Sequence, residues 1–379
     1  MLQEQKRTWA EISRSALRNN CKSIRAQLPP ECGLMSVVKA NGYGHGAAAV
    51  ARQAEQAGCV YLGVACVDEA VSLRKKGVTM PILILGYSQG EYVEMLSDLN
   101  ITQAVGSLQA AQEYSNFITA AGKKLKVHLK LETGMGRTGI DVKQGELQQA
   151  VAALSLPGLD YEGVFTHFAV SDEVEKQEYT AHQFSCFCQA VERLQELTGI
   201  SFKIKHCANS GAVINYPQYH MDMVRPGLAF YGVYPCRRQG EPELVPVMSL
   251  KSRIAAITHH PAGESISYGC TFTAQRDTVL AVLPIGYADG LHRCLSNKME
   301  VSILGKRARQ VGTICMDMCM IDITDLPQVR VGDVATVFGR DDFSGQVVVS
   351  VDEQAKNAGT ISYELLCAVS ERVPRCYVD

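Results

Sequence analysis

The feature that most constrains how this chain can fold is an alternation of short apolar runs with helix-like segments between residues 34 and 227. Each run has the length of a buried strand and ends in turn residues. Helix-like stretches follow most of the runs, at residues 47–57, 67–76 and 176–198 among others. The eight runs are LMSVVKA (34–40), YLGVAC (61–66), PILILG (81–86), TQAVG (102–106), KVHLKLET (126–133), YEGVFTHF (161–168), KIKHCANS (203–210) and DMVRPG (222–227).

Eight strand–helix units in this length of chain predict an α/β fold, specifically a (β/α)8 TIM-type barrel. A doubly wound sheet is the alternative, because both architectures start from alternating strands and helices. The segment YPCRRQGEPELVPV (234–247) is polar and contains prolines, which is typical of a domain boundary. We therefore expect a barrel over residues 10–240 and a second domain over 241–379, on which residues 1–9 could pack.

The second domain is predicted to be mostly β, because strand-like runs follow one another there with few helical patterns. One helical pair is expected near residues 351–373. The strand-like runs are LKSRIAAITHH (250–260), TVLAVLPIGYA (278–288), KMEVSILG (298–305), CMIDITD (319–325) and VGDVATVFG (331–339).

Composition narrows the classes of function. The net charge of the 379-residue chain is -2 and no long basic run occurs, which argues against nucleic acid as a partner. No apolar run approaches the roughly 20 residues that a membrane span needs, and the start, MLQEQKRTWAEIS, lacks the apolar core of a signal peptide. The 14 cysteines contain no C-x2-C pair, so we expect reduced thiols, no metal site and a cytoplasmic protein.

Polar side chains follow several of the predicted strands, where a barrel places its chemistry. These residues are Lys39, Arg137, His167, Ser210 and Arg225. One polar residue at a strand end would mean little. Because all strands of a barrel end at the same mouth, five of them are expected to converge on one site.

Lys39 could be a solvated lysine at a strand end, or a lysine that forms a Schiff base once burial has made its amine nucleophilic. The turn after it raises an alternative, because Gly42, Gly44 and Ala47 fit the dinucleotide pattern G-x-G-x-x-A and Asp68 follows about 20 residues later. A nicotinamide or flavin enzyme therefore stays open. The eight units, and a lysine directly before the turn, weigh against it.

Ser210 and the Arg225-Pro226-Gly227 segment close the last two units. Barrels often bind phosphate there, with loop amides and a helix N-terminus. Ser210 taken alone is better explained as an ordinary helix N-cap. A nucleophilic lysine together with a phosphate site suggests pyridoxal 5'-phosphate, a phosphorylated aldehyde that condenses with lysine.

Nine motifs spread over nearly the whole chain resemble, in order, those of the alanine racemase family. They are VVKANGYGHG, LKLETGMGRTG, THFA, ANSGA, MVRPGLAFYG, SYGCTF, LPIGYADG, CMDMCMID and ISYELLC. The resemblance implies a pyridoxal-phosphate barrel of fold type III, a C-terminal β domain and a head-to-tail homodimer with shared active sites. It also implies a two-base interconversion of L-alanine and D-alanine on a cofactor imine, which supplies D-alanine for peptidoglycan.

The same resemblance assigns roles to individual residues. Lys39 and Tyr268 would be the two catalytic bases, with Tyr268 supplied by the other subunit and Lys39 also holding the cofactor as an internal aldimine. Tyr43, Ser210, Tyr363 and the backbone amides of Gly227 and Leu228 would bind the phosphate. Arg225 would face the pyridine nitrogen, and His167 would link it to Tyr268. Arg137 and the Met316 backbone would hold the substrate carboxylate, beside a Lys130 of the kind that often carries a carbamate.

Taken singly, these residues have plainer explanations. Tyr268 and Tyr363 could be surface aromatics, Met316 a core filler and His167 a hydrogen-bonded buried histidine. A serine or broad-spectrum amino-acid racemase and a non-catalytic pyridoxal-phosphate carrier also stay open. One departure concerns the substrate access channel, because Thr313 stands where the family often has a basic residue, three positions before Met316.

Overall fold

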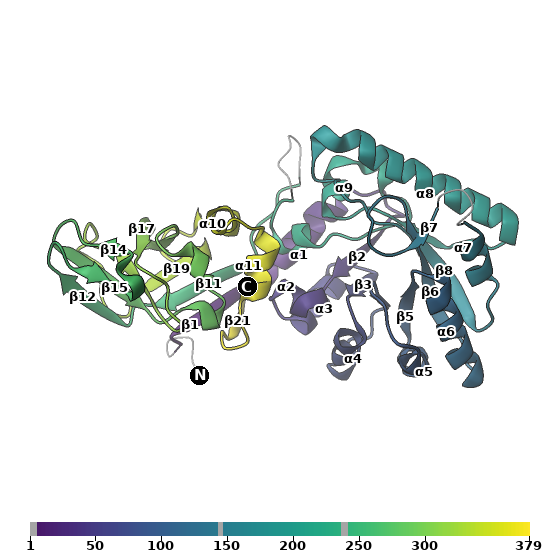
Figure 1. The fold of residues 1–379 in the computed structure, drawn as a ribbon, viewed down its shortest axis with the longest axis horizontal. Helices are drawn as coiled ribbons and strands as arrows, with labels where there is room; N and C mark the ends of the chain where they lie inside the picture. Colours follow the sequence, from purple (N-terminus) through teal and green to yellow (C-terminus); the bar gives the residue numbers. More distant parts are fainter. Residues whose placement is uncertain (1–5, 143–146, 236–241) are drawn as a thin grey trace.

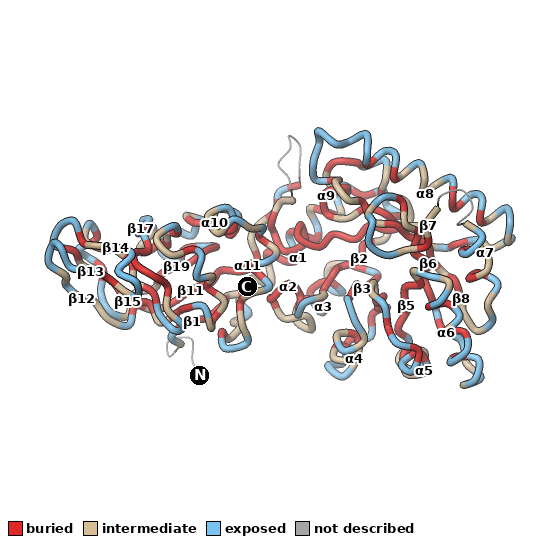
Figure 2. Tube along the Cα trace, in the orientation of Figure 1, coloured by how far each residue is buried: buried red, intermediate tan, exposed pale blue. Residues whose placement is uncertain are grey.

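The computed structural model describes residues 6–142, 147–235 and 242–379. Two bodies follow one another along the long axis of the molecule, a barrel with an outer layer of helices and a β-rich domain (Figure 1). Buried residues concentrate along the strands of both bodies, and exposed residues lie mainly on the outer helices and loops (Figure 2).

The barrel prediction is confirmed, because eight parallel strands follow one another around the first body in the order β10-β2-β3-β4-β5-β6-β8-β9. Backbone hydrogen bonds from Asp222 to Lys205 (3.1 Å) and from Arg225 to Ala208 (2.8 Å) join the two ends of this order. A doubly wound sheet has two unpaired edge strands, whereas these hydrogen bonds close the sheet, so the doubly wound alternative is wrong. The strands are β2 (Gly33–Val37), β3 (Tyr61–Val64), β4 (Ile82–Ile84), β5 (Ile101–Val105), β6 (Leu125–Glu132), β8 (Leu159–Phe165), β9 (Ile204–His206) and β10 (Met223–Val224).

Helices cover the outside of the barrel because each presents one apolar face to the strands. In α1 (Arg14–Arg25), Leu17, Cys21 and Ile24 recur at helical spacing and are fully or almost fully buried, and the Ser13 hydroxyl caps the first turn. The other helices of this body include α3 (Ala47–Gln56), α4 (Val67–Lys75), α5 (Val93–Asp98), α6 (Leu108–Ala120), α7 (Leu147–Leu154), α8 (Gln177–Thr198), α9 (Ser210–Asn215) and the 3-10 turn η5 (Leu228–Tyr231). The short segment α2 (Lys39–Tyr43) is a turn with left-handed backbone rather than a regular helix.

The second body is a ten-stranded sheet in which the described pairs are antiparallel apart from β1–β21. Its main path runs β12-β15-β18-β17-β16-β19-β11-β1-β21, with β20 paired to β19. The strands are β1 (Thr8–Ser13), β11 (Met248–Arg253), β12 (Ala256–His260), β15 (Thr278–Leu283), β16 (Glu300–Ile303), β17 (Lys306–Val311), β18 (Cys319–Asp322), β19 (Val334–Arg340), β20 (Val347–Val349) and β21 (Arg375–Val378). The expected helical pair is α10 (Val351–Ala358) and α11 (Ser362–Ala368).

The first strand of the chain belongs to the second sheet. β1 pairs with β11 from Thr8↔Ser252 to Ile12↔Met248, and α1 then leads into the barrel. The predicted boundary near residue 240 falls outside the described residues, so the division at 240/241 stays a prediction. None of the helices in the described ranges combines the length and apolar character that a bilayer span requires.

Candidate active site

A cavity of about 170 Å³ lies among the C-terminal ends of the barrel strands. All five polar residues predicted to meet there line it, and Tyr43, Lys130, Gly227 and Tyr363 join them. Lys39, Lys130, Arg137 and Arg225 make the lining cationic, and no carboxylate belongs to the described part of it. A cavity of this charge suits a small ligand that carries anionic groups.

Lys39 enters the cavity from the start of a left-handed turn. Ala40, Asn41, Gly42 and Tyr43 have φ values of 51°, 52°, 64° and 51°, although only glycine adopts this region without strain. The carboxylate of Glu69 accepts the Ala40 N–H at 2.6 Å, and this bond compensates part of the strain. The turn brings the Lys39 and Tyr43 side chains to the same cavity.

Burial and the nearby Arg137 guanidinium lower the pKa of Lys39, whereas the Glu69 carboxylate opposes that shift. A lowered pKa increases the fraction of neutral amine, which is the nucleophilic form. Lys39 therefore presents a more nucleophilic amine to the cavity, and Tyr43 lines the same cavity.

Ser210, Gly227 and Tyr43 lie together in the lining of the cavity. The Ser210 hydroxyl accepts the backbone N–H of Gly227 at 2.9 Å and that of Ala229 at 3.3 Å. A Cβ on Gly227 would lie 2.6 Å from the Tyr43 hydroxyl, so glycine is required for this approach. The N-cap of α9 is Asn209 rather than Ser210, because the Asn209 Oδ1 accepts the Ala212 N–H at 3.1 Å. Ser210 is thus available to a ligand.

Both terminal nitrogens of the buried Arg225 guanidinium donate to hydrogen-bond acceptors. Nη1 of Arg225 donates to Nδ1 of His206 at 2.7 Å, and its Nη2 donates to the Thr166 carbonyl at 2.8 Å. The same Nη2 also lies 3.3 Å from Nδ1 of His167. Burial lowers the pKa of Arg225 to about 10, so the guanidinium remains charged near neutral pH. Burial and then Arg225 keep the pKa of His167 well below its usual range.

Lys130 lies inside the barrel on β6, and its Nζ donates to Thr138 Oγ1 at 2.5 Å. Burial, Arg137 and Arg225 together lower its pKa to about 8. The Glu132 carboxylate accepts the backbone N–H groups of Gly134 (2.6 Å) and Arg137 (3.1 Å), and so shapes the loop that carries Arg137. Lys130 and Arg137 line the same cavity as two neighbouring cations.

Tyr363 reaches the barrel cavity from α11 of the second body. Its ring lies 5.8 Å from that of Tyr43, measured between centroids. Burial raises the pKa of Tyr363 to about 12, so its hydroxyl stays protonated and able to donate. Leu228, the remaining residue expected near the phosphate, is buried at the start of η5 directly after Gly227.

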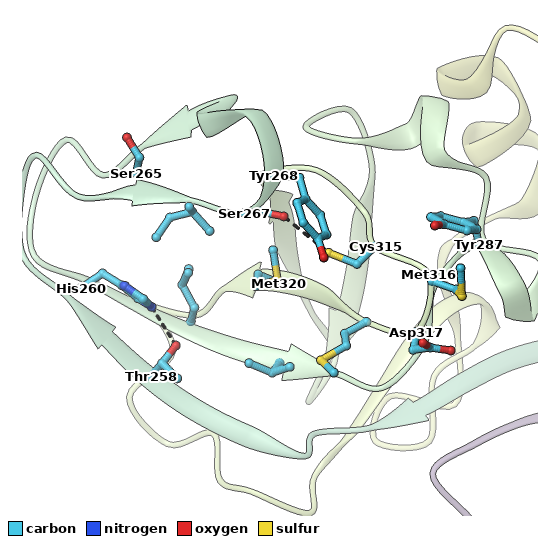
Figure 3. Close-up of a pocket in the computed structure, with 14 residues that line it drawn as sticks. Thr258, His260, Ser265, Ser267, Tyr268, Tyr287, Cys315, Met316, Asp317 and Met320 are labelled. Atoms are coloured by element: carbon cyan, nitrogen blue, oxygen red, sulfur yellow. Dashed lines mark hydrogen bonds between the residues drawn. The ribbon is translucent and has the colours of Figure 1, made fainter.

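Tyr268 and Met316 lie elsewhere in this chain. They line a second cavity of about 870 Å³ in the β-rich domain, together with Cys315 and Tyr287 (Figure 3). Tyr268 is 72% exposed and Met316 is 53% exposed. Thr313 supports this region, because its hydroxyl donates to the Tyr268 carbonyl at 2.7 Å. Within one chain, the structure does not bring Tyr268 to Lys39 or to His167.

Comparison with known proteins identifies the family. The model described as "Alanine racemase, N-terminal domain" matches residues 12–235, and the corresponding C-terminal model matches residues 247–377. The chain belongs to the alanine racemase family. The curated alanine racemase of Desulforamulus reducens is 44% identical over 98% of both chains, and that of Methanococcus maripaludis is 43% identical over 98% of both.

Solved alanine racemases share the fold. That of Clostridium difficile 630 has a TM-score of 0.93 and 38% identity, covering 99% of this chain and 96% of that chain. That of Bacillus anthracis, solved with bound L-Ala-P, has a TM-score of 0.91 and 35% identity, covering 99% and 95%. Membership in the alanine racemase family places the chain among the isomerases, so the nicotinamide and flavin alternatives are wrong.

The glycines that resembled a dinucleotide motif have another use in this alanine racemase fold. Gly42 and Gly44 belong to the left-handed turn after Lys39, and a Cβ on Gly44 would lie 2.2 Å from the Leu366 carbonyl oxygen of α11. The sequence did not point to Glu69, Glu132, Asn209 or His206. Glu69 and His206 contact residues distant in sequence and Glu132 contacts loop backbone, whereas Asn209 is an N-cap that its local sequence could have indicated.

Proposed function

We propose that this chain interconverts L-alanine and D-alanine with pyridoxal 5'-phosphate held at Lys39. The observation that carries the proposal is the convergence of a buried amine, a donor-rich anion cradle and a second pair of cations on one cavity. Family membership supplies the reaction class.

The residues present fit this cofactor. Tyr43, Ser210, Tyr363 and the backbone amides of Gly227 and Leu228 would hold the phosphate, because hydroxyl and N–H groups donate to phosphate oxygens and no carboxylate belongs to the described lining. The Gly227 N–H would exchange its bond to Ser210 for one to the phosphate. Arg225 would face the pyridine nitrogen, since no described group binds its Nε and both terminal nitrogens are already engaged. When bound, pyridoxal phosphate supplies an aldehyde that condenses with amines and a ring that withdraws electrons from the α-carbon.

The chain's own residues would then move the α-proton. Racemisation removes this proton from one face and returns one to the other, so two bases on opposite faces are the simplest arrangement. Lys39 would serve one face after the substrate amine has displaced it. Tyr268 would serve the other. Arg137 and the Met316 backbone would orient the substrate carboxylate.

Arg225 would limit side reactions. A carboxylate at the ring nitrogen would keep that nitrogen protonated, whereas a guanidinium can only donate. The ring would therefore withdraw electrons less strongly, and protonation at atoms other than the α-carbon, which leads to transamination, would be rarer.

The site would be completed in a homodimer. Tyr268 and Met316 are exposed on the β-rich domain and lie away from the barrel cavity of their own chain. An exposed apolar surface of this kind commonly marks an interface. We propose that Tyr268 of the partner subunit reaches His167 and the cavity that holds Lys39. We also propose a cytoplasmic location, which suits a chain with 14 cysteines and no zinc-type spacing.

The test uses purified protein saturated with pyridoxal phosphate. D-alanine should form from L-alanine and the reverse, with a higher kcat/KM than for serine, and an absorbance band of lysine-bound cofactor should vanish on borohydride treatment. Lys39→Ala should lose both. A greater kcat/KM for serine would favour the serine or broad-spectrum alternative. Cofactor bound at Lys39 without any racemisation would favour a non-catalytic carrier.

A further inference from the structure

A chain of polar side chains runs through the interior of the barrel, starting at Arg225. Nη1 of Arg225 lies 2.7 Å from Nδ1 of His206, and Nε2 of His206 lies 2.8 Å from Nδ1 of His128. Nε2 of His128 then lies 3.4 Å from Oε1 of Glu162, a close approach without the geometry of a hydrogen bond. Both imidazoles are fully buried and Arg225 is 4% exposed. The series connects the active-site cavity to a carboxylate on β8 whose side chain is 20% exposed.

The chemistry of its first member fixes the direction of the two hydrogen bonds in the series. Arg225 can only donate, so Nδ1 of His206 must accept and its proton must lie on Nε2. Nε2 of His206 therefore donates to Nδ1 of His128, whose proton in turn lies on Nε2 and faces Glu162. Burial, followed by Arg225, lowers the pKa of His206, and burial also lowers that of His128, so both rings are neutral. Neutral rings of one orientation can transmit polarisation between the two charges.

Glu162 is ionised at the far end. Burial alone would raise its pKa, but the nearby His128 ring and the Tyr61 hydroxyl outweigh this and lower the pKa to about 2. The Tyr61 hydroxyl donates to Oε1 at 2.6 Å, and the Thr102 hydroxyl donates to the same oxygen at 3.2 Å. The carboxylate is thus held in one position by groups from three other strands.

Two backbone features build this arrangement. The register between β6 and β8 shifts so that Val127 faces Tyr161 and His128 faces Gly163, which leaves Glu162 as the extra residue of a β-bulge. Bulges redirect a side chain out of the normal alternation. A Cβ at Gly163 would lie 2.6 Å from the His128 ring, so only glycine leaves room for this imidazole. The bulge and the glycine both serve the same chain of contacts.

We propose that Glu162 is the remote counter-ion of Arg225, with His128 and His206 as the positioning residues that connect them. Burying a guanidinium without a partner is costly, yet no described carboxylate contacts Arg225. A carboxylate placed directly against Arg225 would also lie beside the cavity and weaken the binding of anionic groups. The two imidazoles allow compensation from a distance. The effect on the pyridine nitrogen rests on the proposed function, whereas the counter-ion itself does not.

The first test uses the protein without cofactor and follows the imidazole nitrogens by 15N NMR. In the parent protein, both His128 and His206 should be neutral with the proton on Nε2. Glu162→Gln, which removes the charge but keeps the shape, should shift the Nδ1 resonance of His206, although residue 162 does not touch that ring. The matched control is Asp160→Asn, an exposed carboxylate two residues earlier on β8, which should leave the resonance in place.

The second test uses the loaded enzyme with 15N-labelled pyridoxal phosphate. Glu162→Gln should shift the ring-nitrogen resonance and lower kcat by about tenfold with KM within about twofold, whereas Asp160→Asn should change neither. If Glu162→Gln does not fold, His128→Asn interrupts the chain instead and should shift the same His206 resonance. An unmoved His206 resonance in a folded variant would overturn the proposal. Failure of the parent protein to bind the cofactor would count against the proposed function alone.

Discussion

Glu69 Oε1 accepts a hydrogen bond of 2.6 Å from the backbone N–H of Ala40, the residue that follows Lys39. Its other oxygen accepts the Ala65 N–H at 2.7 Å. One carboxylate therefore joins the end of β3 to the left-handed turn that presents Lys39 to the cavity. Backbone strain of this type persists only where the surroundings hold it.

Glu69→Gln should destabilise the protein by about 1–3 kcal/mol, because the amide nitrogen must face one of the two N–H donors. It should also lower the pKa of Lys39 further, since Glu69 opposes the lowering caused by burial and Arg137. Denaturant unfolding measures the first effect. Asp68→Asn is the matched control in the same first turn of α4, and an equal loss in both variants would assign the effect to the helix terminus instead.

Arg225→Lys should reduce stability by about 2–4 kcal/mol and racemisation by at least about tenfold, because an ammonium cannot satisfy His206, Thr166 and the ring nitrogen together. Arg137→Lys provides the comparison at an exposed arginine of the same cavity. That variant should mainly raise KM for alanine and change stability little. Equal effects of the two substitutions on stability would contradict the central position given to Arg225.

Lys130 predicts a specific dependence of stability on pH. Its pKa is about 8 in the folded chain against the ordinary lysine value of 10.5, so folding expels a proton at pH values between these two. The resulting penalty is complete below pH 8 and disappears as the pH rises toward 10.5. In cofactor-free protein without dissolved CO2, Lys130→Met should therefore be more stable than the parent at pH 7, and the gap should narrow from pH 8 upward. A gap that does not change with pH would refute this.

Carbamylation of Lys130 would convert a repulsive pair with Arg137 into an attractive one. A lysine with a pKa near 8 has enough neutral amine to react with CO2 at neutral pH. Added bicarbonate should therefore stabilise the parent protein and lower KM for alanine, and Lys130→Ala should respond to a small carboxylic acid instead. A bare amine in an experimental density map collected with bicarbonate would defeat this prediction.

Much of the fold could be predicted because its determinants are local. Each of the eight predicted runs overlaps a barrel strand, and Lys39 was conspicuous as a charge near the end of the first run. β1 was not assigned, because the pattern of Thr8–Ser13 fits either sheet and only its pairing with β11 decides. The left-handed turn was also hidden, since Ala40 and Asn41 are not residues that demand φ > 0, and Glu69 holds them from another strand–helix unit.

The candidate site shows the same division. The residues of the barrel mouth could be located from the ends of the predicted strands. The contacts from Arg225 to Glu162 depend on a β-bulge, which the periodicity of the sequence does not indicate. Cys207, three residues before Ser210, is fully buried, and burial raises the pKa of its thiol to about 12, so it packs rather than reacts. Tyr268 could be placed only on the second domain, because its proposed partner residues belong to a second copy of the chain.

The most direct test of the shared site is complementation between two inactive variants. Lys39→Ala and Tyr268→Phe should each be nearly inactive alone. Mixed in equal amounts, denatured and refolded, about half of the dimers should contain one chain of each kind, with one intact site among their two. Racemisation should therefore recover to about a quarter of the parent activity. Verified mixed dimers that remain inactive would show that Lys39 and the partner's Tyr268 do not form one catalytic pair.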